Sequence, residues 1–298
     1  MRRFSIASVC LWLSATSAAA QTAREAYDNG AFVEAAALAE ADGEADDLAL
    51  AARALLAEVV TGDPAQMDTL LARAEANARR ALADDVGNTE ARLQLAVAIG
   101  MKGRRSTVAE AMRRGYAAEG RSLVRAAIRD APREAWAHAL LGGWNLEVVR
   151  RGGPMGGAYF GASVDAGRAA FERARGLAPD DPLIAYQYAV ALLELDAARY
   201  ADEARSLLEA ARTCRASDAF ERRVQARAKS VADAFRIDGA TAAIRTATGR
   251  FARGAKAPAL LARPDNARDP VDLVRSELAH RMAGIERNEF KAHLRASA

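Results

Sequence analysis

The stretch ALADDVGNTEA, at Ala81–Ala91, decides the fold, because related stretches recur along the chain at a nearly constant spacing. In each copy a helical pattern ends on small residues, the chain turns through Asp, Asn or Pro, and a new helical pattern begins. The other copies are AIRDAPREAWA at Ala127–Ala137, ARGLAPDDPLI at Ala174–Ile184 and a weaker ALAEADGEADD at Ala37–Asp47. Successive copies begin 44, 46 and 47 residues apart. This period predicts an all-α fold, a right-handed α-solenoid of about five degenerate helix pairs with C-terminal capping helices.

The first 20 residues have the pattern of a secretory signal. Arg2 and Arg3 precede an apolar run at Phe4–Leu13, and small residues follow up to a cleavage site between Ala20 and Gln21. The apolar run is too short for a bilayer span of ~20 residues. The sequence therefore predicts a periplasmic or secreted protein without a transmembrane span.

Removal of the signal leaves Cys214 as the one cysteine, so no intramolecular disulfide can form. A packed Cys214 thiol is favoured over a reactive thiol or an intermolecular disulfide.

Residues 21–100 carry 6 basic and 15 acidic side chains, whereas residues 101–298 carry 34 basic and 24 acidic ones. This split would orient the protein against a charged partner or surface, although an ordinary solvated surface is the favoured interpretation.

Helices that follow the junctions fit the tetratricopeptide pattern, in which Leu and a small residue lie where paired helices cross. The matching residues are Arg92, Leu95, Ala96 and Ile99, then His138, Leu141, Gly142 and Asn145, then Ala185, Tyr188, Ala189 and Leu192, with Tyr27, Gly30, Phe32 and Ala35 at the first turn. On these residues, positions 23–212 resemble tetratricopeptide repeats.

Residues 91–195 also carry a narrower pattern. It consists of His138, Leu141, Gly142, Trp144, Glu147, Val148 and Val149, a Gly-rich segment ending at Phe160, Gly161, Ala162 and Ser163, and Phe171, Ala174 and Pro179. This part resembles the repeat domain of the regulator of microtubule dynamics proteins and the periplasmic tetratricopeptide proteins associated with TRAP transporters. The resemblance implies a helical scaffold that binds a protein or a ligand, and it implies no catalytic residue.

The sequence divides into the signal at 1–20, a repeat domain at 21–236 and a capping or tail segment at 237–298. Four glycines and Pro154 within Gly152–Gly157 predict a flexible connector instead of a helix. Irregular chain is expected over Gly239–Asp269. An apolar stripe predicts a last helix at Val271–Phe290, favoured as an end cap over an occupant of the groove.

No catalytic, metal-binding or cofactor-binding motif is found. Three histidines and one mature cysteine without HExxH or CxxC spacing do not make a zinc site, and no GxSxG, SxxK or phosphate-binding glycine motif occurs. Aromatic residues are not interleaved with arginines, so nucleic-acid binding is not expected. The sequence predicts neither an enzyme nor a cofactor.

The first helix of each pair lines the concave face of such a solenoid. The groove residues expected there are Glu90, Leu93, Val97, Met101, Trp136, Leu146, Glu147, Leu183, Tyr186, Val190 and Leu193. This apolar face needs a partner, a ligand or a segment of its own chain. We expect a scaffold for a protein or peptide partner in the cell envelope, or alternatively a component of a TRAP-type uptake system that binds a small apolar ligand.

Overall fold

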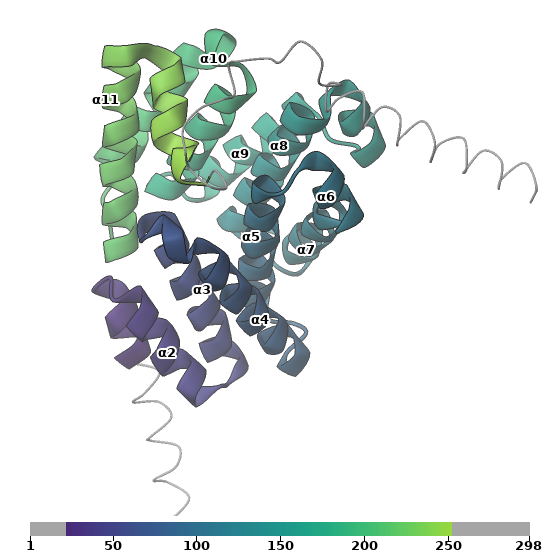
Figure 1. The fold of residues 1–298 in the computed structure, drawn as a ribbon, viewed down its shortest axis with the longest axis vertical. Coiled ribbons are helices and arrows are strands. Elements are labelled where there is room, and N and C mark those ends of the chain that lie inside the picture. The colour runs from purple at the N-terminus through teal and green to yellow at the C-terminus, as the bar shows by residue number, and fades with distance from the viewer. Residues whose placement is uncertain (1–21, 252–298) are drawn as a thin grey trace, which may run out of the picture.

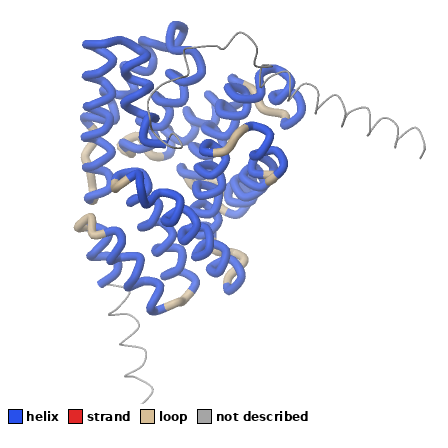
Figure 2. Tube along the Cα trace, in the orientation of Figure 1, coloured by secondary structure: helices blue, strands red, loops and turns tan. Residues whose placement is uncertain are grey.

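The computed structural model describes residues 22–251, and this part of the chain consists of helices and turns without a strand (Figures 1 and 2). Residues 22–28 are helical. The later helices are α2 (Phe32–Asp42), α3 (Ala45–Thr61), η1 (Pro64–Gln66), α4 (Met67–Asp84), α5 (Thr89–Arg105), α6 (Val108–Arg113), α7 (Tyr116–Asp130), α8 (Ala135–Phe160), α9 (Val164–Leu177), α10 (Pro182–Thr213), α11 (Ala219–Thr248) and η2 (Gly249–Phe251). The predicted all-α class is confirmed for these residues.

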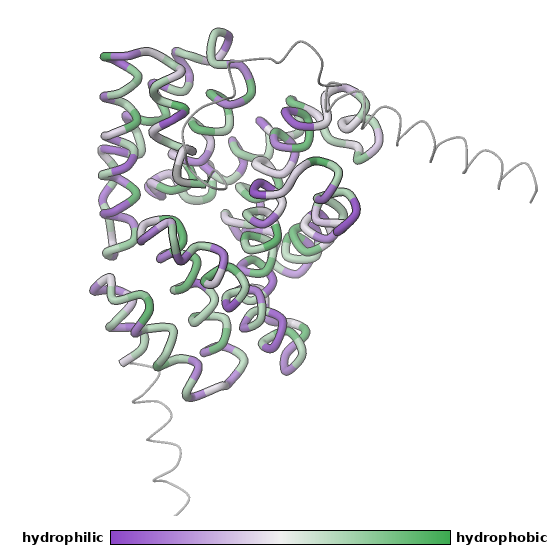
Figure 3. The backbone as a smooth tube through the Cα atoms, viewed as in Figure 1, coloured by the Kyte–Doolittle hydropathy of each residue, from purple (hydrophilic) through white to green (hydrophobic). Residues whose placement is uncertain are grey.

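Two of the expected features, the signal with its cleavage site after Ala20 and the helix at Val271–Phe290, lie outside the described residues. Within residues 22–251, no helix combines the length and the apolar character that crossing a bilayer requires. Hydrophobic and hydrophilic residues alternate along the helices in Figure 3, as expected for helices that bury one face.

Three of the four repeated junctions share one structure, whereas at the weaker copy α2 ends on Gly43 with φ 76° and α3 has no side-chain cap. Helices α4, α7 and α9 end with the same backbone bond, in which the carbonyl of the junction alanine accepts from the amide four residues later. These bonds join Asp85 to Ala81, Ala131 to Ala127 and Ala178 to Ala174. In each case a side chain then caps the next helix: Asn88 for α5, Glu134 for α8 and Asp181 for α10. The recurring sequence therefore encodes recurring helix ends.

Two insertions lengthen the second and third intervals between the junctions beyond the 34 residues of a standard tetratricopeptide unit. The short helix α6 is inserted between α5 and α7, and α8 continues beyond its first helical segment to Phe160. The prediction of a flexible connector at Gly152–Gly157 is wrong, because the chain leaves helical geometry only at Gly153, with φ 59°. Pro154 then starts a second helical segment, a position where its missing N–H costs nothing.

Bends also divide the two last long helices. Asp196 interrupts α10, and its side chain caps the segment that follows by accepting from the Arg199 amide at 3.0 Å. Gly239 interrupts α11 with φ 81°, after which helix continues to Thr248. The prediction of irregular chain from Gly239 onward is therefore wrong for residues 240–248, which are helical. The predicted boundary at residue 236 lies within α11, so it does not separate two secondary-structure elements.

Helices α8 and α9 approach each other closely at two glycines. A Cβ atom at Gly142 would lie 2.5 Å from Cδ2 of Phe171 and 3.0 Å from the carbonyl oxygen of Gly167. A Cβ atom at Gly167 would lie 2.7 Å from Leu146. The small residues predicted at the helix crossings, Ala96, Gly142 and Ala189, are all buried.

The last helix contacts the first ones. Helix α11 packs on α3, and Phe220 lies edge-on to Phe32 with ring centroids 6.2 Å apart. Arg223 lies over the ring of Phe32, donates to the Gly30 carbonyl at 3.0 Å and donates to the Thr61 hydroxyl at 3.1 Å. Gly30 has φ 87°, and a Cβ atom there would lie 3.0 Å from Ala219. One end of α11 thus lies beside the early helices (Figure 1).

Candidate ligand cavity

A cavity of about 410 Å³ lies among the described helices. Residues from α3 and from every helix from α5 to α11 line it, and most of its exposed lining is apolar. It is partly enclosed and opens to solvent. This volume falls in the range of roughly 300–1,000 Å³ that small-molecule sites occupy.

The structure brings the predicted groove residues together, with one exception. Those lining the cavity are Glu90, Leu93, Val97, Met101, Trp136, Leu146, Glu147, Leu183, Tyr186 and Val190. Leu193 is 1% exposed and belongs to the hydrophobic core. Glu194 lines the cavity in its place, because the helical turn from Val190 returns to the same face four residues on.

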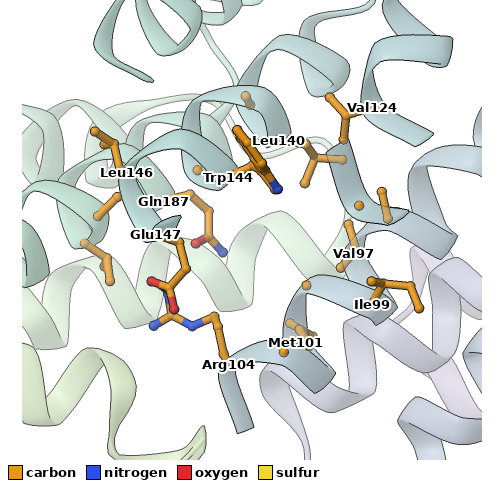
Figure 4. Close-up of a pocket in the computed structure, with 18 of the residues that line it drawn as sticks. Val97, Ile99, Met101, Arg104, Val124, Leu140, Trp144, Leu146, Glu147 and Gln187 are labelled. Atoms are coloured by element: carbon orange, nitrogen blue, oxygen red, sulfur yellow. Dashed lines mark hydrogen bonds and ion pairs between the residues drawn. The ribbon is translucent and has the colours of Figure 1, made fainter. Parts of the chain in front are cut away.

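Apolar and aromatic side chains form the larger part of the wall (Figure 4). Val97 and Met101 come from α5, whereas Leu140 and Trp144 come from α8. The indole N–H of Trp144 donates to the Ala117 carbonyl at 2.8 Å, which satisfies its polar atom and holds the ring in place. Trp136 and Trp144, the two tryptophans that follow the predicted signal, both line the cavity.

Charged residues interrupt this wall at several places, and five of them gather in one cluster. We call Arg104, Glu147, Arg150, Arg151 and Glu194 the arginine cluster; all five line the cavity. Arg104 of α5 donates to Glu147 of α8 at 3.1 Å and to Glu194 of α10 at 2.8 Å. Arg150 donates to both oxygens of Glu147 at 2.9 and 2.8 Å. One guanidinium group therefore joins three of the lining helices.

Nearby opposite charges favour the ionised forms of Glu147 and Arg104. Burial by itself would raise the pKa of Glu147, but the charges of Arg104, Arg150 and Arg151 outweigh it and leave this pKa lowered. Burial would likewise lower the pKa of Arg104, whereas Glu147 and Glu194 raise it.

Sequence reasoning found Glu147 and missed the four other members of the cluster. Arg104 follows Val97 by seven residues, so the helical period was a signal that could have found it. Arg150 and Arg151 directly precede the segment Gly152–Gly157 that was predicted to be a flexible connector. The structure instead places both in α8, where the Arg150 side chain is 31% and the Arg151 side chain 20% exposed.

A second polar group contributes to the lining near α3. Arg53 donates to the Tyr27 hydroxyl at 3.3 Å and pairs with Glu90 at 3.4 Å. Gln94 donates to the same carboxylate at 2.9 Å. Burial raises the pKa of Tyr27 despite the nearby charge of Arg53. The polar side chains of this group are hydrogen-bonded to one another, and the apolar wall lies between this group and the arginine cluster.

The other residues considered for chemistry lie outside the cavity lining. His138 has Nε2 3.0 Å from the Pro132 carbonyl, and Cys214 donates to the Ala210 carbonyl at 3.1 Å. Burial raises the pKa of the Cys214 thiol, which disfavours the thiolate. Among residues 22–251, no three His, Cys, Asp or Glu side chains gather as metal ligands would.

The lining thus combines an apolar wall with a cluster of ion-paired arginines, an arrangement suited to binding. Comparison with family models and with curated proteins gave no match to this chain.

Proposed function

We propose that this protein is an exported, non-enzymatic binding protein of the cell envelope, and that it holds a small, largely apolar molecule in its cavity. The observation that carries the proposal is the cavity itself, in which apolar side chains from helices far apart in the sequence face one partly enclosed space. Removing such a wall from water is favourable by roughly 25 cal/mol per Å² of apolar surface. Export rests on the pattern of the first 20 residues.

The scaffold we propose is a tetratricopeptide-like α-solenoid. Three junctions with the same backbone bonds support this arrangement, as do helices that pack mainly on their neighbours along the chain. A scaffold for protein partners needs a long open groove. The contact between α11 and the early helices shortens the concave side, and this favours a small molecule within a TRAP-type or similar uptake system over an extended peptide.

The experiment uses the mature full chain, decanol as an uncharged apolar probe and tryptophan fluorescence as the readout. We expect a saturable change in emission, because Trp136 and Trp144 line the cavity. Val97→Lys places a charge in the apolar wall and is expected to weaken binding at least about tenfold. Val86→Lys is the matched control, since Val86 is 79% exposed and lies outside the lining.

Circular dichroism first establishes that both variants fold. Absence of saturable binding to the wild-type protein, or equal binding by the folded Val97→Lys variant, would contradict the proposal. A probe that binds only after truncation behind Ala262 would show instead that the C-terminal segment occupies the cavity.

A further inference from the structure

We infer that the ligand of this cavity is an alkyl carboxylate, with its anionic head at the arginine cluster and its chain along the apolar wall. This inference rests on the proposed function and adds to it the chemical class of the ligand. Three observations carry it: the charge balance of the cluster, the environment of Arg151 and the position of the cluster relative to the wall.

The cluster holds more positive than negative charge. Its three guanidinium groups are permanently charged, and they are opposed by the two carboxylates of Glu147 and Glu194. Glu147 is shared between Arg104 and Arg150. Among residues 22–251, one positive charge of the cluster therefore has no carboxylate of its own.

Arg151 holds that excess charge. Its side chain is 20% exposed, and it donates to the carbonyls of Gly103 and Ser106 at 2.6 Å each. Within the described residues, the one carboxylate it approaches is Glu147, at 4.0 Å. Burial and the charges of Arg150 and Arg104 lower the pKa of Arg151, although Glu147 acts in the opposite direction. An incoming carboxylate would supply the missing counter-charge.

The bonds of Arg151 to the end of α5 also have a structural role, since cations stabilise the C-terminus of a helix. Stabilising the C-terminus of α5 would require Arg151 alone, without Arg104 and Arg150 beside it. The cluster gathers all three on one side of a cavity whose exposed lining is mostly apolar, although other charged residues such as Arg53 and Glu90 also line it.

The position of the cluster suits an amphiphile. In Figure 4, Arg104 and Glu147 point toward each other, while Met101, Val97 and Leu140 continue the wall away from them toward Trp144. A chain bound along this wall would gain about fourfold in affinity for each methylene that it buries. The charged head then selects among molecules that share the same chain.

The test compares decanoate, decanol and decyltrimethylammonium at about pH 8, where the carboxylic acid is ionised. Tryptophan fluorescence gives the dissociation constants. We expect decanoate to bind the wild-type protein at least about tenfold more tightly than decanol, as hydrogen bonds to a charged partner allow. The cation should bind most weakly.

Two variants change this preference in opposite directions. Arg151→Gln removes the excess charge and should bring decanoate and decanol to similar affinities. Glu194→Gln removes a carboxylate partner of Arg104 and should strengthen decanoate binding further. Loss of folding cannot explain a gain in affinity. Arg215→Gln is the matched control, because Arg215 is exposed and does not line the cavity.

Each outcome is decisive. Equal binding of decanoate and decanol to the wild-type protein, tighter binding of the cation, or an unchanged preference in both variants overturns the inference while the proposed function stands. Failure of all three probes to bind overturns both.

Discussion

Gly142→Val is expected to destabilise the protein by about 3 kcal/mol, a large part of the roughly 5–15 kcal/mol that holds a typical domain folded. A Cβ atom at this position would overlap the ring of Phe171 and crowd the Gly167 backbone. The ring cannot withdraw easily, since Phe171 is buried and stacks on Tyr188 with centroids 4.6 Å apart. Helices α8 and α9 would have to separate. Urea unfolding followed by circular dichroism measures the loss.

The matched control is Gly176→Ala in the same helix pair. Gly176 is exposed and has no atom within 4 Å of the added Cβ. Alanine favours helix over glycine, so the control should gain up to about 1 kcal/mol. Wild-type stability in Gly142→Val would show that α8 and α9 do not cross at this glycine.

Phe32→Ala is expected to cost about 3–5 kcal/mol, the range for truncating a buried phenylalanine. Phe32 is 1% exposed and contacts Tyr27, Phe220 and Arg223. Since Phe220 and Arg223 belong to α11, the cavity left by the truncation weakens the contact between the last helix and the first ones. Thermal and urea unfolding both report the change.

Val33→Ala serves as its control, because Val33 is the next residue of the same helix and is 44% exposed. Its effect should stay within about 0.5 kcal/mol of the wild type. Equal effects of the two substitutions would contradict the contact between α11 and Phe32.

The positions of the helix ends at the junctions could be predicted from the sequence. Caps and turns depend on residues a few positions apart, so the sequence around Ala81, Ala127 and Ala174 contains all the determinants of those helix ends. The helical period likewise placed ten of the eleven predicted groove residues in the cavity lining. The helical period failed at Leu193. Residues three and four positions after Val190 can both lie on the same helix face as Val190, so the period does not choose between Leu193 and Glu194. In the structure Leu193 is buried where α10 packs against α11, while Glu194 lines the cavity.

Glycine-rich composition was misleading at Gly152–Gly157. Intrinsic preference argues against helix there, but a single non-helical residue at Gly153 suffices to redirect the chain. The second segment of α8 then brings Phe160 against Trp144, with ring centroids 6.3 Å apart. Tertiary contacts of this kind outweigh a weak local preference.

By itself, then, the sequence determined the all-helical class of residues 22–251, the positions of the repeated helix ends and an apolar face on the helices that follow them. These features follow from local periodicity and capping. Only the tertiary structure decided that α11 meets α2 and α3, and that Arg104 joins Glu147 to Glu194, a residue 90 positions further along the chain. Such contacts depend on how successive helices rotate and stack, which no short stretch of sequence records.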